Sequence, residues 1–295
     1  MLAFDFFSPE EPLLFAPFQD QGYEVYIKRD DLIHPFISGN KWRKLKYVVS
    51  DAVEQNKRHL VTFGGAWSNH LLATAAAAAR FGLKATGYVR GEPVENPVLH
   101  LCRLFGMELR FTDRTSYRDK VGLFEAAYGA DPDAYLIHEG GAGPLALPGC
   151  AEIITELQRS YDHLFCACGT GTTLAGLSMG LRQQGLITHL HGVSVLKGGD
   201  FLKEDIRNLY PEAAPFTLHT DYHAGGYAKT SPDLNRFIQT FVSATGVLIE
   251  PVYTGKMMYA LSDLIHRGAF EPGARILVLH TGGLTGILGK IDFFN

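Results

Sequence analysis

Several features are scarce or missing in this chain of 295 residues, and each absence narrows the class of protein. No charge sign dominates, since the net charge is −4 and no long basic block occurs, which argues against a nucleic-acid partner. The longest apolar runs, around 75–79, fall well short of the roughly 18 residues that a membrane span needs. The N-terminal stretch "MLAFDFFSPEEPLLF" carries acids and prolines but no basic leader, so we expect a cytoplasmic protein.

Cysteine is also scarce, with four residues in the chain. Cys166 and Cys168 lie two apart in "LFCACGTG", where the alternation of a strand would point both side chains to one face. A zinc site needs four ligands, and no second pair with suitable spacing occurs. We therefore expect no metal site, and buried thiols in a reducing compartment.

What the sequence does contain is a regular alternation of strand and helix patterns. Its length suggests two lobes or one large α/β unit, and 46% hydrophobic with 20% charged residues is typical of a soluble globular protein. Short apolar or alternating segments that run into glycine or polar loops predict strands near 23–30, 59–65, 84–89, 107–112, 134–141, 163–168, 189–196 and 274–283. Helical patterns between them indicate an α/β fold with a mostly parallel sheet, whose ligands bind beyond the C-terminal strand ends.

The most informative of these strand-end loops is "GTGTT" at 169–173. It follows an apolar strand and opens a helix, so its unpaired backbone amides could bind a phosphate. A purely structural glycine turn is the alternative. The loop is neither a Walker motif nor a full dinucleotide fingerprint, and a nucleotide enzyme would lack an acidic metal-binding partner, so a lone phosphate fits better.

Other predicted strand ends also carry polar groups. "GGAWSNH" places Ser68, Asn69 and His70 at a helix start, although Ser68 would serve as an N-cap and Asn69 could simply face solvent. Thr281 follows the last strand, and Tyr253 follows "GVLIEPV", which we interpret as another strand end. In "SGNKWRKLKY" a basic cluster, normally a solvated helix face, brings Lys41 to a fifth such loop, with Asn40 as the expected helix cap.

Together, in this order, these pieces resemble the pyridoxal-phosphate enzymes of the tryptophan-synthase β type, and among them the 1-aminocyclopropane-1-carboxylate deaminase and D-cysteine desulfhydrase family. The matching segments are "KRDDL" at 28–32, "GNKWRKL" at 39–45, "GGAWSNH" at 64–70, "GTGTT" at 169–173, "GGYA" at 225–228, "PVYTGK" at 251–256 and "HTGG" at 280–283. The resemblance implies a two-domain, three-layer α/β fold with mostly parallel twisted sheets. A large cofactor domain would comprise 1–45 and 151–295, and a small domain 46–150.

The resemblance also assigns the cofactor contacts. Lys41 corresponds to the lysine that forms the Schiff base with pyridoxal 5′-phosphate, with its amine's pKa lowered by burial, whereas Lys44 and Lys46 are expected to be surface charges. The residues expected to cradle the phosphate are Gly169, Thr170, Gly171, Thr172 and Thr173. Asn69 should bond the ring's phenolic oxygen O3′.

Further roles concern the ring face and the substrate. Tyr253 should stack on the pyridine ring, and the hydroxyl of Thr281 should meet the ring nitrogen. Ser68 and His70 should face the carboxylate of an amino-acid substrate, and Tyr227 should reach the substrate side of the ring. The residues to which the resemblance assigns catalytic roles are Lys41, Ser68, Tyr227 and Tyr253.

One position separates the possible reactions. The cyclopropane deaminases carry glutamate where this chain has Thr254, and a carboxylate beside the ring nitrogen makes the ring a stronger electron sink. Threonine favours β-elimination from a small amino acid, with D-cysteine giving pyruvate, ammonia and sulfide as the type case. The alternatives are 1-aminocyclopropane-1-carboxylate deamination to 2-oxobutyrate and ammonia, racemisation or D-serine dehydration, and a non-catalytic pyridoxal-phosphate-binding protein. Relatives of this fold commonly dimerise, so a homodimer is expected.

Overall fold

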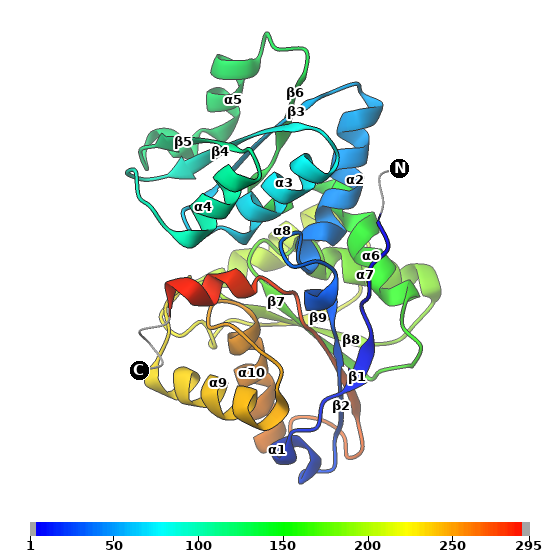
Figure 1. The fold of residues 1–295 in the computed structure, drawn as a ribbon. Helices are drawn as coiled ribbons and strands as arrows, with labels where there is room; N and C mark the ends of the chain where they lie inside the picture. The colour runs from blue at the N-terminus through cyan, green and yellow to red at the C-terminus, as the bar shows by residue number, and fades with distance from the viewer. Residues whose placement is uncertain (1–3, 291–295) are drawn as a thin grey trace.

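Two mainly parallel β-sheets form the core of the protein, as seen in a computed structural model that describes residues 4–290 (Figure 1). The larger sheet has the strand order β1 (Glu10–Pro12), β2 (Glu24–Lys28), β10 (Arg275–Leu279), β7 (His163–Cys168), β8 (His189–Ser194) and β9 (Phe216–His219). The smaller sheet has the order β5 (Glu108–Thr112), β4 (Lys84–Arg90), β3 (His59–Gly65) and β6 (Ala134–Ile137). Every neighbouring pair is parallel except β1 with β2.

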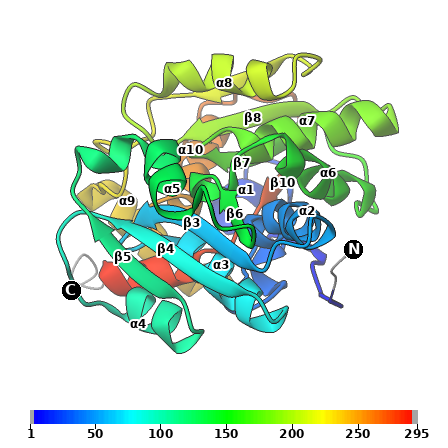
Figure 2. The same ribbon diagram turned by 90° about the horizontal axis from the view of Figure 1, so that it is seen from above.

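Helices cover both faces of each sheet, which gives the layered architecture that the sequence predicts (Figures 1 and 2). The helices are α1 (Ala16–Gln19), α2 (Asn40–Glu54), α3 (Asn69–Arg80), α4 (Pro97–Leu104), α5 (Lys120–Tyr128), α6 (Leu147–Thr155), α7 (Thr172–Gln184), α8 (Leu202–Leu209), α9 (Pro232–Thr245) and α10 (Thr254–His266). Helices α6, α7 and α8 pack on one face of the larger sheet, and α1, α9 and α10 pack on the other face.

Strand β7 shows how the sequence produces these layers. Its side chains alternate, so Cys166 and Cys168 join the core beneath α6 and α7, while Phe165 and Ala167 join the core beneath α9 and α10. Both thiols are buried and free, as predicted. Among the described residues no group of three or more His, Cys, Asp or Glu side chains is arranged to hold a metal ion.

The fold class and the predicted strands agree with the structure, with a few differences. The short strands β1 and β9 had no recognisable pattern, and the "GVLIEPV" segment is irregular rather than a strand because it turns directly into α10. The two sheets fall on either side of the expected domain division, although α2 crosses residue 45; the bounds themselves stay a prediction. In the chain from 4 to 290, every helix is too short or too polar to cross a bilayer.

Candidate active site

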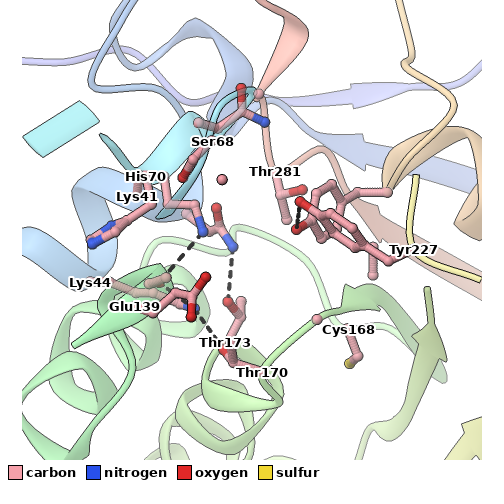
Figure 3. A pocket seen from close by; sticks show the side chains of 18 of the residues that line it. Lys41, Lys44, Ser68, His70, Glu139, Cys168, Thr170, Thr173, Tyr227 and Thr281 are labelled. Carbon is pink, nitrogen blue, oxygen red and sulfur yellow. Dashed lines mark hydrogen bonds between the residues drawn. The ribbon is translucent and has the colours of Figure 1, made fainter. Parts of the chain in front are cut away.

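A cavity of about 550 Å³ lies where the C-terminal strand ends of the two sheets meet (Figure 3). Its walls come from the loops after β7 and β10 in the larger sheet, the loops after β3 and β6 in the smaller sheet, and the start of α2. This is the edge at which parallel α/β sheets bind ligands, and the volume suits a small cofactor with its substrate.

Helix α2 can begin at this cavity only because residue 39 is glycine. Gly39 has φ of +57°, and a Cβ atom there would lie 1.9 Å from the carbonyl oxygen of Thr281. Asn40 is the first helical residue rather than the predicted cap. Its backbone N–H donates to the carbonyl of Thr281 at 3.3 Å, and its side-chain amide donates to the hydroxyl of Thr173 at 3.1 Å. Two glycine-rich loops of the larger body are therefore held to the start of α2.

Lys41 projects from the first turn of α2 into the cavity. Its amine lies 3.5 Å from the carbonyl oxygen of Gly140. Burial lowers the pKa of this amine to about 7, and the charge of neighbouring Lys44 acts in the same direction. Near neutral pH a large fraction of Lys41 is thus an uncharged amine, which is the nucleophilic form.

Lys44 corrects one of the sequence predictions. It is 3% exposed and lines the cavity, whereas it was expected to be a surface charge. Its amine lies 3.3 Å from both the carbonyl of Gly140 and the hydroxyl of Thr170. The signal was present in the sequence, because positions i and i+3 of a helix share a face, so the exposure of Lys41 to the cavity implies that of Lys44. Lys46, on another side, pairs with Glu152 at 2.7 Å.

The loop after β7 brings its backbone amides to the cavity wall at the start of α7. Gly171 is the N-cap residue with φ of +71°, and the first amides of a helix have no partner within the helix. Four of the five predicted residues line the cavity: Gly169, Thr170, Gly171 and Thr173. Thr172 does not; it is fully buried, and its hydroxyl lies 3.1 Å from that of Thr170.

Ser68, Asn69 and His70 all line the opposite wall. Ser68 caps α3 as predicted, because its Oγ accepts a hydrogen bond from the N–H of Leu71 at 3.2 Å, which leaves its hydroxyl proton available. The Oδ1 of Asn69 accepts from Thr285, so its NH₂ group is the part free to donate to a ligand.

His70 is neutral, and its tautomer follows from its partner. The hydroxyl of Thr62 donates to the carbonyl of Ile137, so at 2.8 Å it must accept a hydrogen bond from Nε2–H of His70. Nδ1 is then a bare acceptor, and it is buried without a partner. Burial holds the pKa of His70 well below its usual value, with Lys41 and Lys44 adding to the effect. The ring therefore does not offer the donor that the predicted carboxylate contact requires.

Tyr253, Tyr227 and Thr281 complete the site. The ring of Tyr253 lies against Gly169, where an added Cβ atom would be 3.2 Å from the tyrosine Cε1. The hydroxyl of Tyr253 donates to that of Tyr227 at 3.3 Å. Tyr227, Tyr253 and Thr281, which lie on distant segments of the sequence and were predicted as site residues, therefore all line the cavity.

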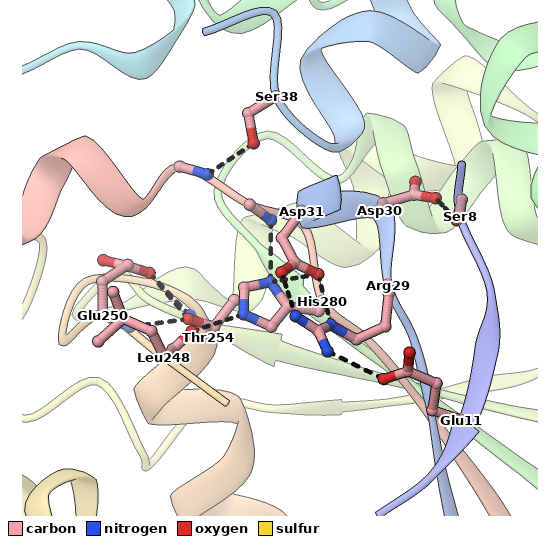
Figure 4. Close-up of polar contacts among 12 residues, drawn as sticks. Ser8, Glu11, Arg29, Asp30, Asp31, Ser38, Leu248, Glu250, Thr254 and His280 are labelled. Carbon is pink, nitrogen blue, oxygen red and sulfur yellow. Dashed lines mark hydrogen bonds and ion pairs between the residues drawn. The ribbon is translucent and has the colours of Figure 1, made fainter. Parts of the chain in front are cut away.

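The hydrogen bonds of His280 hold the loop that carries Thr281 in place (Figure 4). His280 Nε2 donates to the carbonyl of Leu248 at 2.8 Å, and Nδ1 accepts from the N–H of Gly282 at 3.1 Å. Thr254 takes no part in the cavity wall: its hydroxyl lies 3.3 Å from Glu250 Oε1. Glu250 accepts three backbone N–H bonds at the start of α10 and so positions the chain beside Tyr253.

The cavity is poor in carboxylates. Glu139 is the one acidic side chain among the described lining residues, and it is held by the hydroxyl of Tyr117 at 3.0 Å and the amine of Lys120 at 3.2 Å. Within residues 4–290, no carboxylate lines the cavity beside Thr281. The wall instead combines two lysine amines with a glycine loop at the start of α7, where backbone amides lack partners within the helix. This arrangement fits a ligand bearing both an aldehyde and a phosphate.

Comparisons with known proteins agree with this chemistry. The family described as "pyridoxal-phosphate dependent enzyme" matches residues 9–282. The chain is 34% identical to a D-cysteine desulfhydrase of Serratia proteamaculans, over 89% of this chain and 87% of the relative. It is 30% identical to the bifunctional D-cysteine desulfhydrase/1-aminocyclopropane-1-carboxylate deaminase of Arabidopsis thaliana, over 92% and 75%. A crystal structure of an "ACC deaminase homologue" superposes with a TM-score of 0.88 at 32% identity, over 97% and 92% of the two chains.

Proposed function

Because this chain belongs to the family of pyridoxal-phosphate dependent enzymes, we propose that it is a lyase that carries out β-elimination on a small amino acid such as D-cysteine. The observation that carries the proposal is the pair of amines that one face of α2 brings to the cavity, Lys41 with a pKa lowered to about 7 and Lys44 against the glycine loop. Names of relatives support the reaction class, since D-cysteine desulfhydrases are among them.

Specific residues would hold the cofactor. The amides of the 169–173 loop and the amine of Lys44 would bind its phosphate, because donors at a helix start and a nearby ammonium both favour an anion. The NH₂ of Asn69 would donate to O3′, Tyr253 would pack on the ring, and Thr281 would face the ring nitrogen. When bound, pyridoxal 5′-phosphate supplies an aldehyde carbon that binds amines and a ring that spreads negative charge.

Lys41 would act twice. As a neutral amine it would hold the cofactor through the aldehyde carbon, and as a base it would take the proton from the substrate Cα. Thiolate then leaves from Cβ, and addition of one water gives pyruvate, ammonia and hydrogen sulfide overall. The carbonyl of Gly140, 3.5 Å from the amine, would accept a hydrogen bond from it.

The substrate carboxylate would bind to the hydroxyl of Ser68, whose proton is available beside the capped end of α3. The hydroxyl of Tyr227 would reach the leaving group at the cavity mouth. His70 offers an acceptor rather than a donor, so we assign it to an N–H or O–H group rather than to the carboxylate.

The chemistry of the wall beside Thr281 favours elimination over ring opening. A hydroxyl there cannot hold a proton on the ring nitrogen as a carboxylate would, so the ring accepts less charge. Departure of a good leaving group relieves charge at Cα and asks less of the ring. Opening a cyclopropane has no such leaving group.

The test is an assay of the purified, cofactor-loaded protein with D-cysteine, L-cysteine and 1-aminocyclopropane-1-carboxylate, in which sulfide and 2-oxoacids are measured. We expect sulfide and pyruvate from cysteine in equal amounts, and none from Lys41→Ala. Production of 2-oxobutyrate from the cyclopropane substrate alone would replace this proposal with deamination. Binding of cofactor without turnover of any amino acid would indicate a non-catalytic binding protein.

The remaining sequence predictions belong to this proposal. A homodimer is checked by light scattering on the eluting protein, and the division into domains 1–45 with 151–295 and 46–150 by limited proteolysis. A cytoplasmic location is checked by cell fractionation.

A further inference from the structure

Lys256, in the first turn of α10, is a buried lysine that the proposed mechanism leaves unused. It is fully buried, and its amine donates to the carbonyl of Gly226 at 2.8 Å and lies 3.5 Å from that of Val195. Among residues 4–290 no carboxylate lies within ion-pair distance of it; Glu250 and Lys290 are the charged groups that act on it from further away. Its hydrogen-bond partners are backbone carbonyls of two loops.

The carbonyl of Gly226 belongs to the peptide unit that leads directly into Tyr227. The loop around it is conformationally demanding, because φ is positive at Ala224, Gly225, Gly226 and Ala228. Alanine rarely adopts this left-handed conformation, so the loop needs outside contacts to keep it. Tyr227 itself is 48% exposed, and its hydroxyl accepts a hydrogen bond from that of Tyr253 at 3.3 Å. The buried amine thus binds the carbonyl of the peptide unit that precedes Tyr227, and this carbonyl also accepts the N–H of Lys229 at 3.1 Å.

The charge of Lys256 does not help the fold. Burial lowers the pKa of its amine to about 8, with Glu250 opposing and Lys290 adding to the effect. The unfolded chain therefore binds this proton more readily between pH 8 and the usual lysine value of 10.5, so this group destabilises the fold at neutral pH. Methionine would fill a similar volume without that cost. A role in positioning explains why an amine is present.

We propose that Lys256 is a positioning residue that holds Tyr227 at the mouth of the cavity by binding the carbonyl of Gly226, and thereby couples α10, which follows Tyr253, to the substrate side of the site. This inference rests on the proposed function for the role of Tyr227, but the tether itself is a property of the protein alone. Both carbonyls that Lys256 contacts lie next to the cavity, because Leu196 follows Val195, Tyr227 follows Gly226, and both line the cavity.

Hydrogen exchange measured by mass spectrometry tests the tether without any assay of activity. The amides of Gly226 and Lys229 are bonded within the loop, to the carbonyls of His223 and Gly226. In Lys256→Met we expect exchange over 222–230 to accelerate at least about tenfold, because the loop loses its buried anchor. The matched control is Lys28→Met, which removes a buried lysine paired with Glu156 and should leave this segment unchanged. Equal exchange in Lys256→Met and the wild type would overturn the proposal.

Raising the pH provides the same test in the wild type, in case Lys256→Met does not fold. The charged or titratable groups on the packed segments include Lys197, Tyr222, His223, Tyr227, Lys229, Glu250, Tyr253 and Lys290. After correction for intrinsic exchange, protection of the Gly226 and Lys229 amides should fall between pH 7 and 9 while that of α10 stays constant. Opening of the loop would leave the amine buried in α10 without its acceptors, and a neutral amine binds a carbonyl more weakly than an ammonium does. Deprotonation therefore loosens this loop although it favours the fold as a whole. Constant protection of both amides from pH 7 to 9 would contradict the tether.

Steady-state kinetics then test whether the tether affects turnover through Tyr227. Lys256→Met should lower kcat/KM for cysteine roughly tenfold, and Tyr227→Phe should lower it by a similar factor. If both act through Tyr227, the double variant should be little worse than either single one. Fully multiplicative losses would overturn the positioning role. If the wild type turns over no amino acid, the proposed function fails, but the exchange measurements still decide the tether.

Discussion

Helix α2 carries buried cations on two of its sides, and the two sides differ in what surrounds the charge. On one side Arg43 forms a bidentate pair with Asp30 at 2.8 and 3.1 Å and also binds Glu156, which Lys28 contacts at 2.9 Å. On the other side Lys41 and Lys44 meet carbonyl and hydroxyl oxygens of neutral groups. The first region is a closed ion-pair cluster, and the second is open to the cavity.

The difference separates charges that serve the fold from those that serve a ligand. Burial alone would lower the pKa of Arg43, but Asp30 and Glu156 more than reverse this and raise it overall. Burial likewise raises the pKa of Glu156, and Arg43 brings it below its usual range. Lys41 and Lys44 have no carboxylate to compensate for burial, so the pKa of each is lowered. Uncompensated amines in a cavity are available to bind an anion or attack an aldehyde.

The sharpest test of this contrast is Lys41→Ala. Activity should fall by roughly 10³-fold or more, because the amine serves as both nucleophile and base. Stability should not fall and could rise at neutral pH, since no ion pair is lost and an amine with a lowered pKa destabilises the fold. The measurements are kcat with D-cysteine and the melting temperature, with Lys46→Ala as the control on the same helix. Retained turnover and retained visible colour of the bound cofactor in Lys41→Ala would end the assignment.

Arg43→Met should do the opposite. Removing the guanidinium leaves Asp30 buried without a partner, which should lower the free energy of unfolding by roughly 3–5 kcal/mol. Denaturant unfolding measures this loss. Adding Asp30→Asn should recover part of it, because the uncompensated charge is gone. A variant as stable as the wild type would show that the cluster is not what holds α2.

Lys44→Met would sharpen the contrast within the cavity. Loss of a charge-assisted bond of about 1.5–3 kcal/mol should weaken binding of pyridoxal 5′-phosphate roughly 10- to 150-fold. Binding of pyridoxal, which lacks the phosphate, should be unchanged at a pH where Lys41 is neutral in both proteins. Titration of the protein with each aldehyde, followed by absorbance, distinguishes the two. Equal weakening for both aldehydes would place Lys44 away from the phosphate.

The pH dependence of cofactor binding tests the pKa of Lys41 without a substitution. Because the pKa of Lys41 is about 7, the fraction of neutral amine rises about tenfold per pH unit below pH 7 and levels off above it. The rate at which the cofactor-free protein captures pyridoxal 5′-phosphate should rise with pH in the same way. Stopped-flow absorbance provides the rates. In Lys44→Met the midpoint should move upward, because a positive neighbour is gone. A midpoint near the usual value for lysine would show that the amine is not buried in solution.

The smallest expected effect concerns Ser68, which serves both the fold and the cavity. Ser68→Ala and Ser231→Ala each remove an N-cap, of α3 and α9, and each should cost about 1 kcal/mol of stability. KM should rise roughly fivefold in Ser68→Ala but stay constant in Ser231→Ala. Thermal unfolding and steady-state kinetics on the same samples separate the two roles. An unchanged KM in Ser68→Ala would remove Ser68 from the substrate contacts.

Much of the fold could be read from local patterns. The alternation in β7 put Cys166 and Cys168 on one face, and the capping serine before an alanine-rich run set the start of α3. These features depend on neighbours within a few residues. Strands β1 and β9 were missed because they are short and lack a pattern of their own, and they form through pairing with distant strands.

The site could be predicted less completely. Lys44 was misplaced because a basic cluster normally faces water, and only its distance of three residues from Lys41 argued otherwise. Thr172 belongs to the right loop, but the loop's conformation turns it away from the cavity. The tautomer of His70 depends on Thr62 and Ile137, two residues on different strands, so no sequence pattern contains it.

The sequence by itself determined the order of strands and helices, the glycine loops at strand ends and the family, because periodicity, capping and turn chemistry act over short stretches of chain. Only the tertiary structure decided which charges are compensated, which hydroxyls are already occupied and how strongly each amine holds its proton. Those properties depend on burial and on partners contributed by distant segments, as Gly140 and Thr170 are for Lys44 and as Gly226 is for Lys256.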